Sequence, residues 1–258
     1  MSFFRYDFGY AWPWTSGHLI AALVFATLAV LLWRARLPRW VATLFGVLTV
    51  WALVGAAITH VALRLSLPLV LPTEAFLSAQ GGRVLDLGAG SGRASLMVLL
   101  ARPQSTVVAL DIFSESYGID GNTPERLRAN IAAAGAAGRL EVQMGDIRDM
   151  PFPDASFDGA VSAYVIDHMS RESVERSLAE TRRVLKPGGD FLLMVINPDA
   201  WVRVALPMFY EHGYFGQKPR PDFWRERLVT AGFDIVEVGT KPGTLYVLGR
   251  TLATSTSR

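Results

Sequence analysis

Two long uncharged segments occupy most of the first seventy residues. Neither residues 17–33 nor residues 40–63 include a charged side chain, and tryptophans stand near their ends. A helix rises about 1.5 Å per residue and needs roughly 20 residues to cross a hydrocarbon core, so the second segment is long enough to span a bilayer and the first is nearly so. The link 34–39 is short and contains three arginines. This pattern predicts an N-terminal membrane hairpin of two helices, within a first unit of residues 1–70.

Two alternative structures fit these segments less well. Buried core helices normally keep a polar stripe, and neither segment has one. A cleaved signal peptide would end in small residues, whereas the first apolar run ends in Trp-Arg-Ala-Arg and a second apolar run follows it. We therefore expect the hairpin to be retained.

Residues 71–251 have a different pattern, in which short apolar runs typical of buried strands alternate with helical stretches. Such alternation favours an α/β domain with a mostly parallel sheet. The chain after residue 251 is expected to be a tail, 252–258. Strands are expected at 83–87, 106–111, 140–147, 157–163 and 190–196, followed by an antiparallel pair at 234–238 and 244–248. Helices are expected at 93–102, from 124 onward, before a glycine stop at 185–189, and at 223–231.

Composition narrows the chemistry. The formal net charge is only +2, and basic residues do not form a run with interleaved aromatic residues, so nucleic acid is not expected as a partner. The chain has no cysteine, which excludes a thiolate nucleophile and a cysteine-ligated metal site. No bound metal is expected.

A glycine-rich loop follows the first expected strand. Asp86 stands two residues before Gly88, and Gly90 and Gly92 follow at alternate positions. A strand, glycine loop and helix in succession bring backbone N–H groups and a helix N-terminus against a ligand. The dinucleotide fingerprint G-x-G-x-x-G places its third glycine one residue later, so the spacing argues against a nicotinamide oxidoreductase. A plain tight turn is the alternative.

This D-x-G-x-G-x-G pattern resembles motif I of class I S-adenosylmethionine-dependent methyltransferases. Further along come a strand that ends in Asp111, the sequence G-D-x-x-x-x-P-F-P-D-x-S-F-D from Gly145, and L-K-P-G-G from Leu185. Together these motifs resemble the Methyltransf_11-like branch of that family over about residues 80–195. The resemblance implies a Rossmann-like seven-stranded sheet that ends in an antiparallel strand pair, with S-adenosylmethionine as the methyl donor.

The resemblance also implies roles for particular residues. Asp111 would hold the ribose hydroxyls, Asp146 and the backbone of Ile147 would bind the adenine, and the glycine loop would hold the methionine end. An Asx-turn is the alternative role for Asp146. The longer stretch 112–123 would lay a loop near the site, with Tyr117 in it. The expected cofactor-binding residues are Asp86, Gly88, Ala89, Gly90, Gly92, Asp111, Ile112, Asn122, Asp146, Ile147, Ser162 and Ala163.

Three residues after the fourth strand are candidates for the chemistry: Tyr164, Asp167 and His168. They follow the carboxyl end of that strand, where ligands of open α/β sheets bind. A histidine accepts protons near neutral pH, and a neighbouring carboxylate raises its basicity. The alternatives are that His168 caps the next helix at Ser170 and that Tyr164 is a packing aromatic residue.

The insertion at 197–218 is rich in aromatic and apolar residues, among them Trp201, Phe209 and Tyr214. Beside a membrane hairpin, an apolar lid favours a lipophilic acceptor such as a lipid or a quinone, delivered from the bilayer. Core packing against the sheet is the alternative. A small thiol, a metalloid or another toxic small molecule is the other acceptor class left open, and a non-catalytic cofactor-binding subunit of a membrane complex is the alternative from another class.

The expected topology contains a conflict. The arginines of the link 34–39 would place the link in the cytoplasm and both termini outside, whereas S-adenosylmethionine is a cytoplasmic cofactor. We expect a membrane protein with a cytoplasmic catalytic domain, whose folding overrides the rule or whose hairpin lies in the interface.

Overall fold

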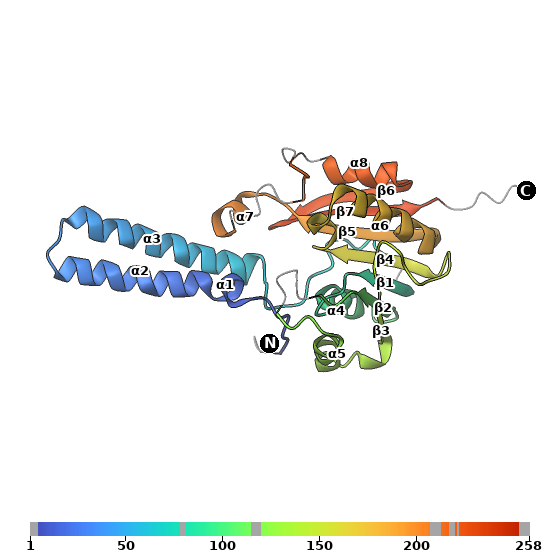
Figure 1. Ribbon diagram of the computed structural model, residues 1–258, viewed down its shortest axis with the longest axis horizontal. Coiled ribbons are helices and arrows are strands. Elements are labelled where there is room, and N and C mark those ends of the chain that lie inside the picture. The colour runs from blue at the N-terminus through green and yellow to red at the C-terminus, as the bar shows by residue number, and fades with distance from the viewer. Residues whose placement is uncertain are drawn as a thin grey trace, which may run out of the picture.

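The computed structural model describes residues 5–77, 81–114, 120–206, 213–216, 220 and 222–252. A helical hairpin projects from one end of an α/β domain (Figure 1). The hairpin consists of α2 (Gly17–Arg34) and α3 (Arg39–Ala57). The short helix α1 (Trp12–Thr15) precedes it, and a turn of π-helix, η1 (Ile58–Ala62), continues α3 toward the domain.

The two hairpin helices pack on each other and leave most of their apolar side chains exposed. The rings of Phe25 and Phe45 lie 6.2 Å apart across the pair. Only 6% of the Gly17–Arg34 stretch and 22% of the Arg39–Ala62 stretch is buried, and both are long and apolar enough to cross a membrane. Core helices would be covered by the rest of the protein, so that alternative does not describe this hairpin.

The sheet has seven strands in the order β3-β2-β1-β4-β5-β7-β6. Strands β1 to β5 run parallel, and β7 pairs antiparallel with both β5 and β6. This is the expected Rossmann-like sheet with its terminal antiparallel pair. The strands are β1 (Arg83–Leu87), β2 (Thr106–Asp111), β3 (Leu140–Met144), β4 (Phe157–Ala163), β5 (Leu185–Ile196), β6 (Phe233–Lys241) and β7 (Thr244–Thr251).

Helices cover both faces of the sheet, and each face has its own apolar core. One face is covered by α4 (Arg93–Ala101) and α5 (Pro124–Ala133), the other by α6 (Arg171–Val184) and α8 (Phe223–Thr230). The Thr123 side chain caps α5 and the Ser170 side chain caps α6, each accepting a backbone N–H three residues later. The remaining short helices are η3 (Ala137–Arg139), η4 (Ile166–His168) and α7 (Ala200–Ala205).

Two element boundaries differ from those expected. Helix α6 ends without a glycine stop, because Leu185 is already extended and pairs with Phe157, so that β5 begins five residues earlier than expected. Strand β3 ends at Met144 rather than near residue 147. There the Gly145 N–H donates to the carbonyl of Asp111 at 3.0 Å and the chain turns through Asp146.

The segment before the hairpin packs on the α/β domain. Phe8 is buried in the core formed with α4 and α5, and its carbonyl accepts a hydrogen bond from the hydroxyl of Ser91 at 2.8 Å. The Asn130 side chain bonds both the N–H and the carbonyl of Asp7. A division of the chain at residue 70 therefore separates two stretches that share one core.

Candidate active site

The glycine loop joins β1 to α4 and is held by backbone hydrogen bonds to the neighbouring strand β2. The N–H groups of Gly88 and Ala89 both donate to the carbonyl of Leu110, at 2.8 and 3.1 Å. Gly88 has φ +71°, and a Cβ atom there would lie 2.5 Å from a methyl carbon of Val165. Only glycine therefore fits at this position without displacing its neighbour. Gly92, with φ +87°, stands directly before α4 and is not among the residues that line the cavities beside the glycine loop.

Asp111, the last residue of β2, ties three segments together. Its carboxylate accepts hydrogen bonds from the N–H of Gly90 at 2.8 Å and from the N–H of Phe113 at 2.5 Å. The side-chain amide of Asn122 lies 3.4 Å from the same carboxylate. A carboxylate has about four acceptor positions, so at least one remains for a ligand hydroxyl.

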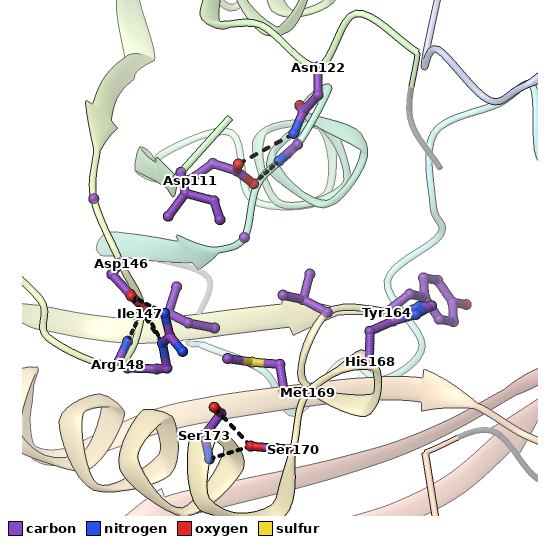
Figure 2. A pocket seen from close by; sticks show the side chains of 15 residues that line it. Asp111, Asn122, Asp146, Ile147, Arg148, Tyr164, His168, Met169, Ser170 and Ser173 are labelled. Carbon is purple, nitrogen blue, oxygen red and sulfur yellow. Dashed lines mark hydrogen bonds and ion pairs between the residues drawn. The ribbon is translucent and has the colours of Figure 1, made fainter. Parts of the chain in front are cut away.

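A cavity of 280 Å³ lies along the carboxyl ends of the parallel strands. Figure 2 shows Asp111 and Asn122 on one side of it, and Asp146 with Arg148 across from Tyr164 and His168. Seven of the expected cofactor residues line this cavity, and Ala89 and Ala163 line the adjoining, larger cavity. The seven are Gly88, Gly90, Asp111, Ile112, Asn122, Asp146 and Ile147.

Asp146 forms an ion pair with Arg148, two residues further along the same turn. Its carboxylate accepts the N–H of Arg148 at 2.8 Å and a guanidinium nitrogen of the same residue at 2.6 Å. The hydrogen bonds to Arg148 lower the pKa of Asp146 and keep it ionised. The geometry is that of the Asx-turn alternative, and Asp146 nevertheless lines the cavity. Sequence reasoning missed Arg148, which no motif marks.

Two expected cofactor residues are buried behind the loop. Asp86 is 1% exposed and accepts a hydrogen bond from Ser95 at 2.6 Å, while its other carboxylate oxygen has no partner among the described residues. Burial raises the pKa of Asp86 to about 7. The hydroxyl of Ser162 on β4 is likewise buried without a partner in the described part of the chain.

The buried polar atoms without a hydrogen-bond partner are evidence on whether the site fits S-adenosylmethionine. A buried polar atom without a partner costs free energy until a ligand or water satisfies it. The unpartnered oxygen of Asn122, which lines the cavity, suits a ribose hydroxyl, whereas Asp86 and Ser162 line neither cavity. The glycine loop, Asp111 and Asn122 fit the cofactor.

The three candidate catalytic residues have separate positions. Tyr164, with φ +57°, directs its hydroxyl to that of Thr244 on β7, and burial raises its pKa. Asp167 is 3% exposed and accepts a hydrogen bond from the N–H of Ile196 at 3.0 Å, so it holds the last residue of β5 in place. His168 lines the cavity, and burial lowers its pKa. The cap of α6 is Ser170, so the capping alternative for His168 is wrong.

A second cavity of 460 Å³ opens beside the first. The two share Gly88, Gly90, Tyr164, Val165 and His168, so they meet at the glycine loop and the turn after β4. Much of the second wall comes from segments that flank the hairpin. These contributions are Tyr10, Trp14, Leu63, Leu65 and Leu69, and α7 and the chain after it add Val202 and Leu206.

The described residues of the insertion at 197–218 lie in two environments. Val202 and Leu206 line the second cavity. Tyr214 is buried and its ring lies 4.9 Å from that of Phe223, which is the core-packing alternative. Tyr117 and the stretch 207–212 lie outside the described residues.

Comparisons with known proteins agree with this geometry. Residues 84–189 match the family model described as a methyltransferase domain. The chain is 34% identical over 128 residues to a ubiquinone/menaquinone biosynthesis C-methyltransferase of Geotalea daltonii, covering 48% of this chain and 49% of that one. It is 38% identical over 136 residues to a fatty-acid O-methyltransferase of Mycolicibacterium smegmatis, covering 52% and 44%.

The chain therefore spans about half the length of the curated relatives it matches. An O-methyltransferase family protein from Burkholderia thailandensis has the same fold, with a TM-score of 0.58 at 17% identity over 81% of this chain and 61% of that one. Together with the glycine loop, Asp111 and the cavity at the sheet edge, the match over residues 84–189 shows that the chain contains a class I S-adenosylmethionine-dependent methyltransferase domain, with S-adenosylmethionine as its methyl donor.

Proposed function

We propose that the whole protein transfers a methyl group from S-adenosylmethionine to a lipophilic acceptor at a membrane surface. The observation that carries this proposal is the pair of joined cavities. One is lined by the polar residues at the sheet edge, and the other is largely apolar and walled by segments that flank the hairpin. A cofactor and an apolar acceptor held in them would meet at Tyr164 and His168.

The smaller cavity supplies the cofactor contacts. Asp111 and Asn122 would hold the ribose, and Ile147 with Asp146 would contact the adenine. The backbone of Gly88 and Gly90 leaves room for the methionine end, close to the buried Asp86. When bound, S-adenosylmethionine supplies an electrophilic methyl group on a sulfonium. Methyl transfer is an in-line displacement, so holding the acceptor atom about 3 Å from that methyl group provides most of the rate increase.

His168 is suited to receive a proton from an acceptor that carries one. Its lowered pKa keeps the imidazole neutral near pH 7, which is the form that acts as a base. Tyr164 positions the wall between the cavities through its hydrogen bond to Thr244. Asp167 acts on the site through the backbone of β5 and the turn that precedes His168, rather than by touching the acceptor.

The relatives support a lipophilic acceptor. One relative is named for ubiquinone and menaquinone biosynthesis and another for fatty acids. Quinones of this kind and fatty acids are apolar over most of their length. Nine of the residues that line the second cavity are leucine, valine, tyrosine or tryptophan, which suits the same class.

We propose in addition that the hairpin anchors the protein in a bilayer, with the catalytic domain in the cytoplasm. Leu23, Val47 and Val50 are among the hairpin side chains more than 60% exposed, which in water leaves a large apolar surface uncovered. The cavity walled by Trp14 and Leu63 lies at the base of this hairpin, so an acceptor dissolved in the membrane would have a short path to it.

An internal excision tests the anchor. Replacing residues 19–54 by a short Gly-Ser linker should give a protein that no longer co-floats with phosphatidylcholine vesicles and keeps its affinity for S-adenosylmethionine within about 2-fold. The two cut ends lie together, because a Cβ atom on Gly55 would collide with the ring of His18. Flotation and calorimetric titration are the measurements.

Deleting residues 1–65 is the informative comparison. That deletion also removes Phe8 from the core, which costs about 1.5–3 kcal/mol, and removes its hydrogen bond with Ser91. We expect the second variant to be less stable to urea than the first. An excised protein that still floats with the vesicles would contradict the anchor.

A further inference from the structure

Arg93 is a buried cation without a carboxylate partner. It is the first residue of α4, directly after the glycine loop, and is 7% exposed. Its guanidinium makes hydrogen bonds to four oxygen atoms, which are the carbonyls of Leu63, Arg64 and Leu67 and the hydroxyl of Tyr10. All four are uncharged. No aspartate or glutamate of the described residues forms an ion pair with it.

This position is unfavourable for a positive charge unless something compensates it. The N-terminal end of a helix carries a partial positive charge, which disfavours a cation at the first residue. A buried charge needs a counter-charge as well as hydrogen bonds to offset its lost hydration. The aromatic faces of Phe8 and Tyr10 lie 5.9 and 5.8 Å from the guanidinium carbon and supply part of the compensation.

The guanidinium lies in the wall of the larger, apolar cavity. Arg93 lines that cavity together with Tyr10 and Tyr164 and does not line the smaller one, where the expected cofactor carboxylates and amides gather. Its charge acts on the hydroxyl of Tyr164, where it opposes the rise in pKa that burial causes. One end of an otherwise apolar pocket is therefore electropositive, next to the junction of the two cavities.

The contacts also leave donor capacity on the guanidinium. Nε and one terminal nitrogen bond the carbonyls of the segment 63–67 at 2.8 to 3.2 Å. The other terminal nitrogen has only the 3.4 Å contact to the hydroxyl of Tyr10, which is long for a hydrogen bond. A guanidinium nitrogen carries two N–H groups, so this one can donate to a ligand oxygen.

We propose that Arg93 makes the larger cavity a binding site for lipophilic acids, that is, for an acceptor with an ionised oxygen, such as a carboxylate, on an apolar body. The proposal rests on the proposed function and narrows its acceptor class. The anion compensates the buried guanidinium, and the apolar body packs against leucine and valine side chains of the cavity. An acceptor that binds in ionised form has no proton to lose, so its reaction does not require His168 as a base.

The test compares an acid with its neutral analogue on the full-length protein in nanodiscs. Decanoate should bind at least about 10-fold more tightly than decan-1-ol, because only the acid forms a charge pair with Arg93. Arg93→Gln should remove that preference, so that decanoate binds no more tightly than decan-1-ol. Arg93→Lys, which keeps the charge, should retain most of it. Binding is measured by displacement of a fluorescent fatty acid, with S-adenosylmethionine affinity determined in parallel.

The outcomes separate the possible sources of the anion. Equal binding of decanoate and decan-1-ol by the unaltered protein would overturn the proposal, and this comparison needs no variant to fold. A loss of S-adenosylmethionine affinity in Arg93→Gln with the decanoate preference intact would also overturn it, because Arg93 would then serve the carboxylate of the cofactor. Preferential decanoate binding without methyl transfer to any lipid would instead contradict the proposed function alone.

Discussion

Replacing Asp111 with asparagine is expected to weaken S-adenosylmethionine binding by about 100-fold. The carboxylate accepts N–H groups of Gly90 and Phe113 through different oxygens, so an amide NH₂ in either position would face a donor. The glycine loop would lose one of its three hydrogen bonds to β2, and the ribose would lose a charged acceptor. Hydrogen bonds to charged groups contribute about 1.5–3 kcal/mol each, which corresponds to this loss.

The measurement is calorimetric titration of the purified protein with S-adenosylmethionine. Asp234→Asn is the matched control, because Asp234 lies on β6 at the far edge of the sheet and is exposed. We expect the control to bind the cofactor as the unaltered protein does. Similar affinities for the two variants would remove Asp111 from the cofactor site.

Gly88→Ala is expected to abolish measurable cofactor binding and to lower the free energy of unfolding by about 3 kcal/mol. Two costs combine at this position. A left-handed φ costs a residue with a Cβ atom roughly 1–2 kcal/mol, and the contact of 2.5 Å with Val165 forces a shift that costs about 1–3 kcal/mol. Because Val165 belongs to both cavities, its displacement changes the site as well as the stability.

Gly135→Ala isolates the first of these costs. Gly135 has φ +74°, close to that of Gly88, and a Cβ atom there meets nothing within 4 Å. Urea unfolding should show a loss of about 1 kcal/mol for this variant, and titration should show unchanged cofactor affinity. Equal effects of the two substitutions on both measurements would mean that the contact with Val165 carries no weight.

Local patterns in the sequence predicted the strands, and the resemblance of the motifs to class I methyltransferases implied the order of the sheet and the edge at which the cofactor is expected. Strands β1, β2 and β4 appear as short apolar runs, and parallel strands bring their carboxyl ends to one edge, so Asp111 and His168 could be expected to meet the glycine loop. The end of β3 was misplaced because the run 140–147 looks continuous, although Gly145 bonds back to β2 and ends the pairing.

The acceptor side could not be predicted in the same way. Phe8 contacts the core beside α4 and α5, and Arg93 bonds the carbonyls of Leu63 and Arg64. These contacts join residues that are tens to more than a hundred positions apart, and local periodicity carries no information about such pairs. The role of Asp167 was hidden for the same reason, because its partner is a backbone N–H on β5.

The structure also shows that the hairpin and the α/β domain are packed together rather than joined only by the chain. The hairpin is attached to the catalytic domain on both sides, through Phe8 before it and through the carbonyls held by Arg93 after it. Such attachment fixes the base of the hairpin relative to the glycine loop. We therefore expect the segments that flank the hairpin to hold one wall of the proposed acceptor cavity, while the hairpin itself serves as an anchor.

The most direct measurement of the proposed activity is transfer of a radiolabelled methyl group from S-adenosylmethionine to a membrane lipid extract. We expect label in the organic phase with the unaltered protein, and label reduced to background with Asp111→Asn. Mass spectrometry of the labelled product then identifies the acceptor. Label that stays entirely in the aqueous phase, or label in the organic phase that is equal for both proteins, would contradict methyl transfer to a lipophilic acceptor by this site.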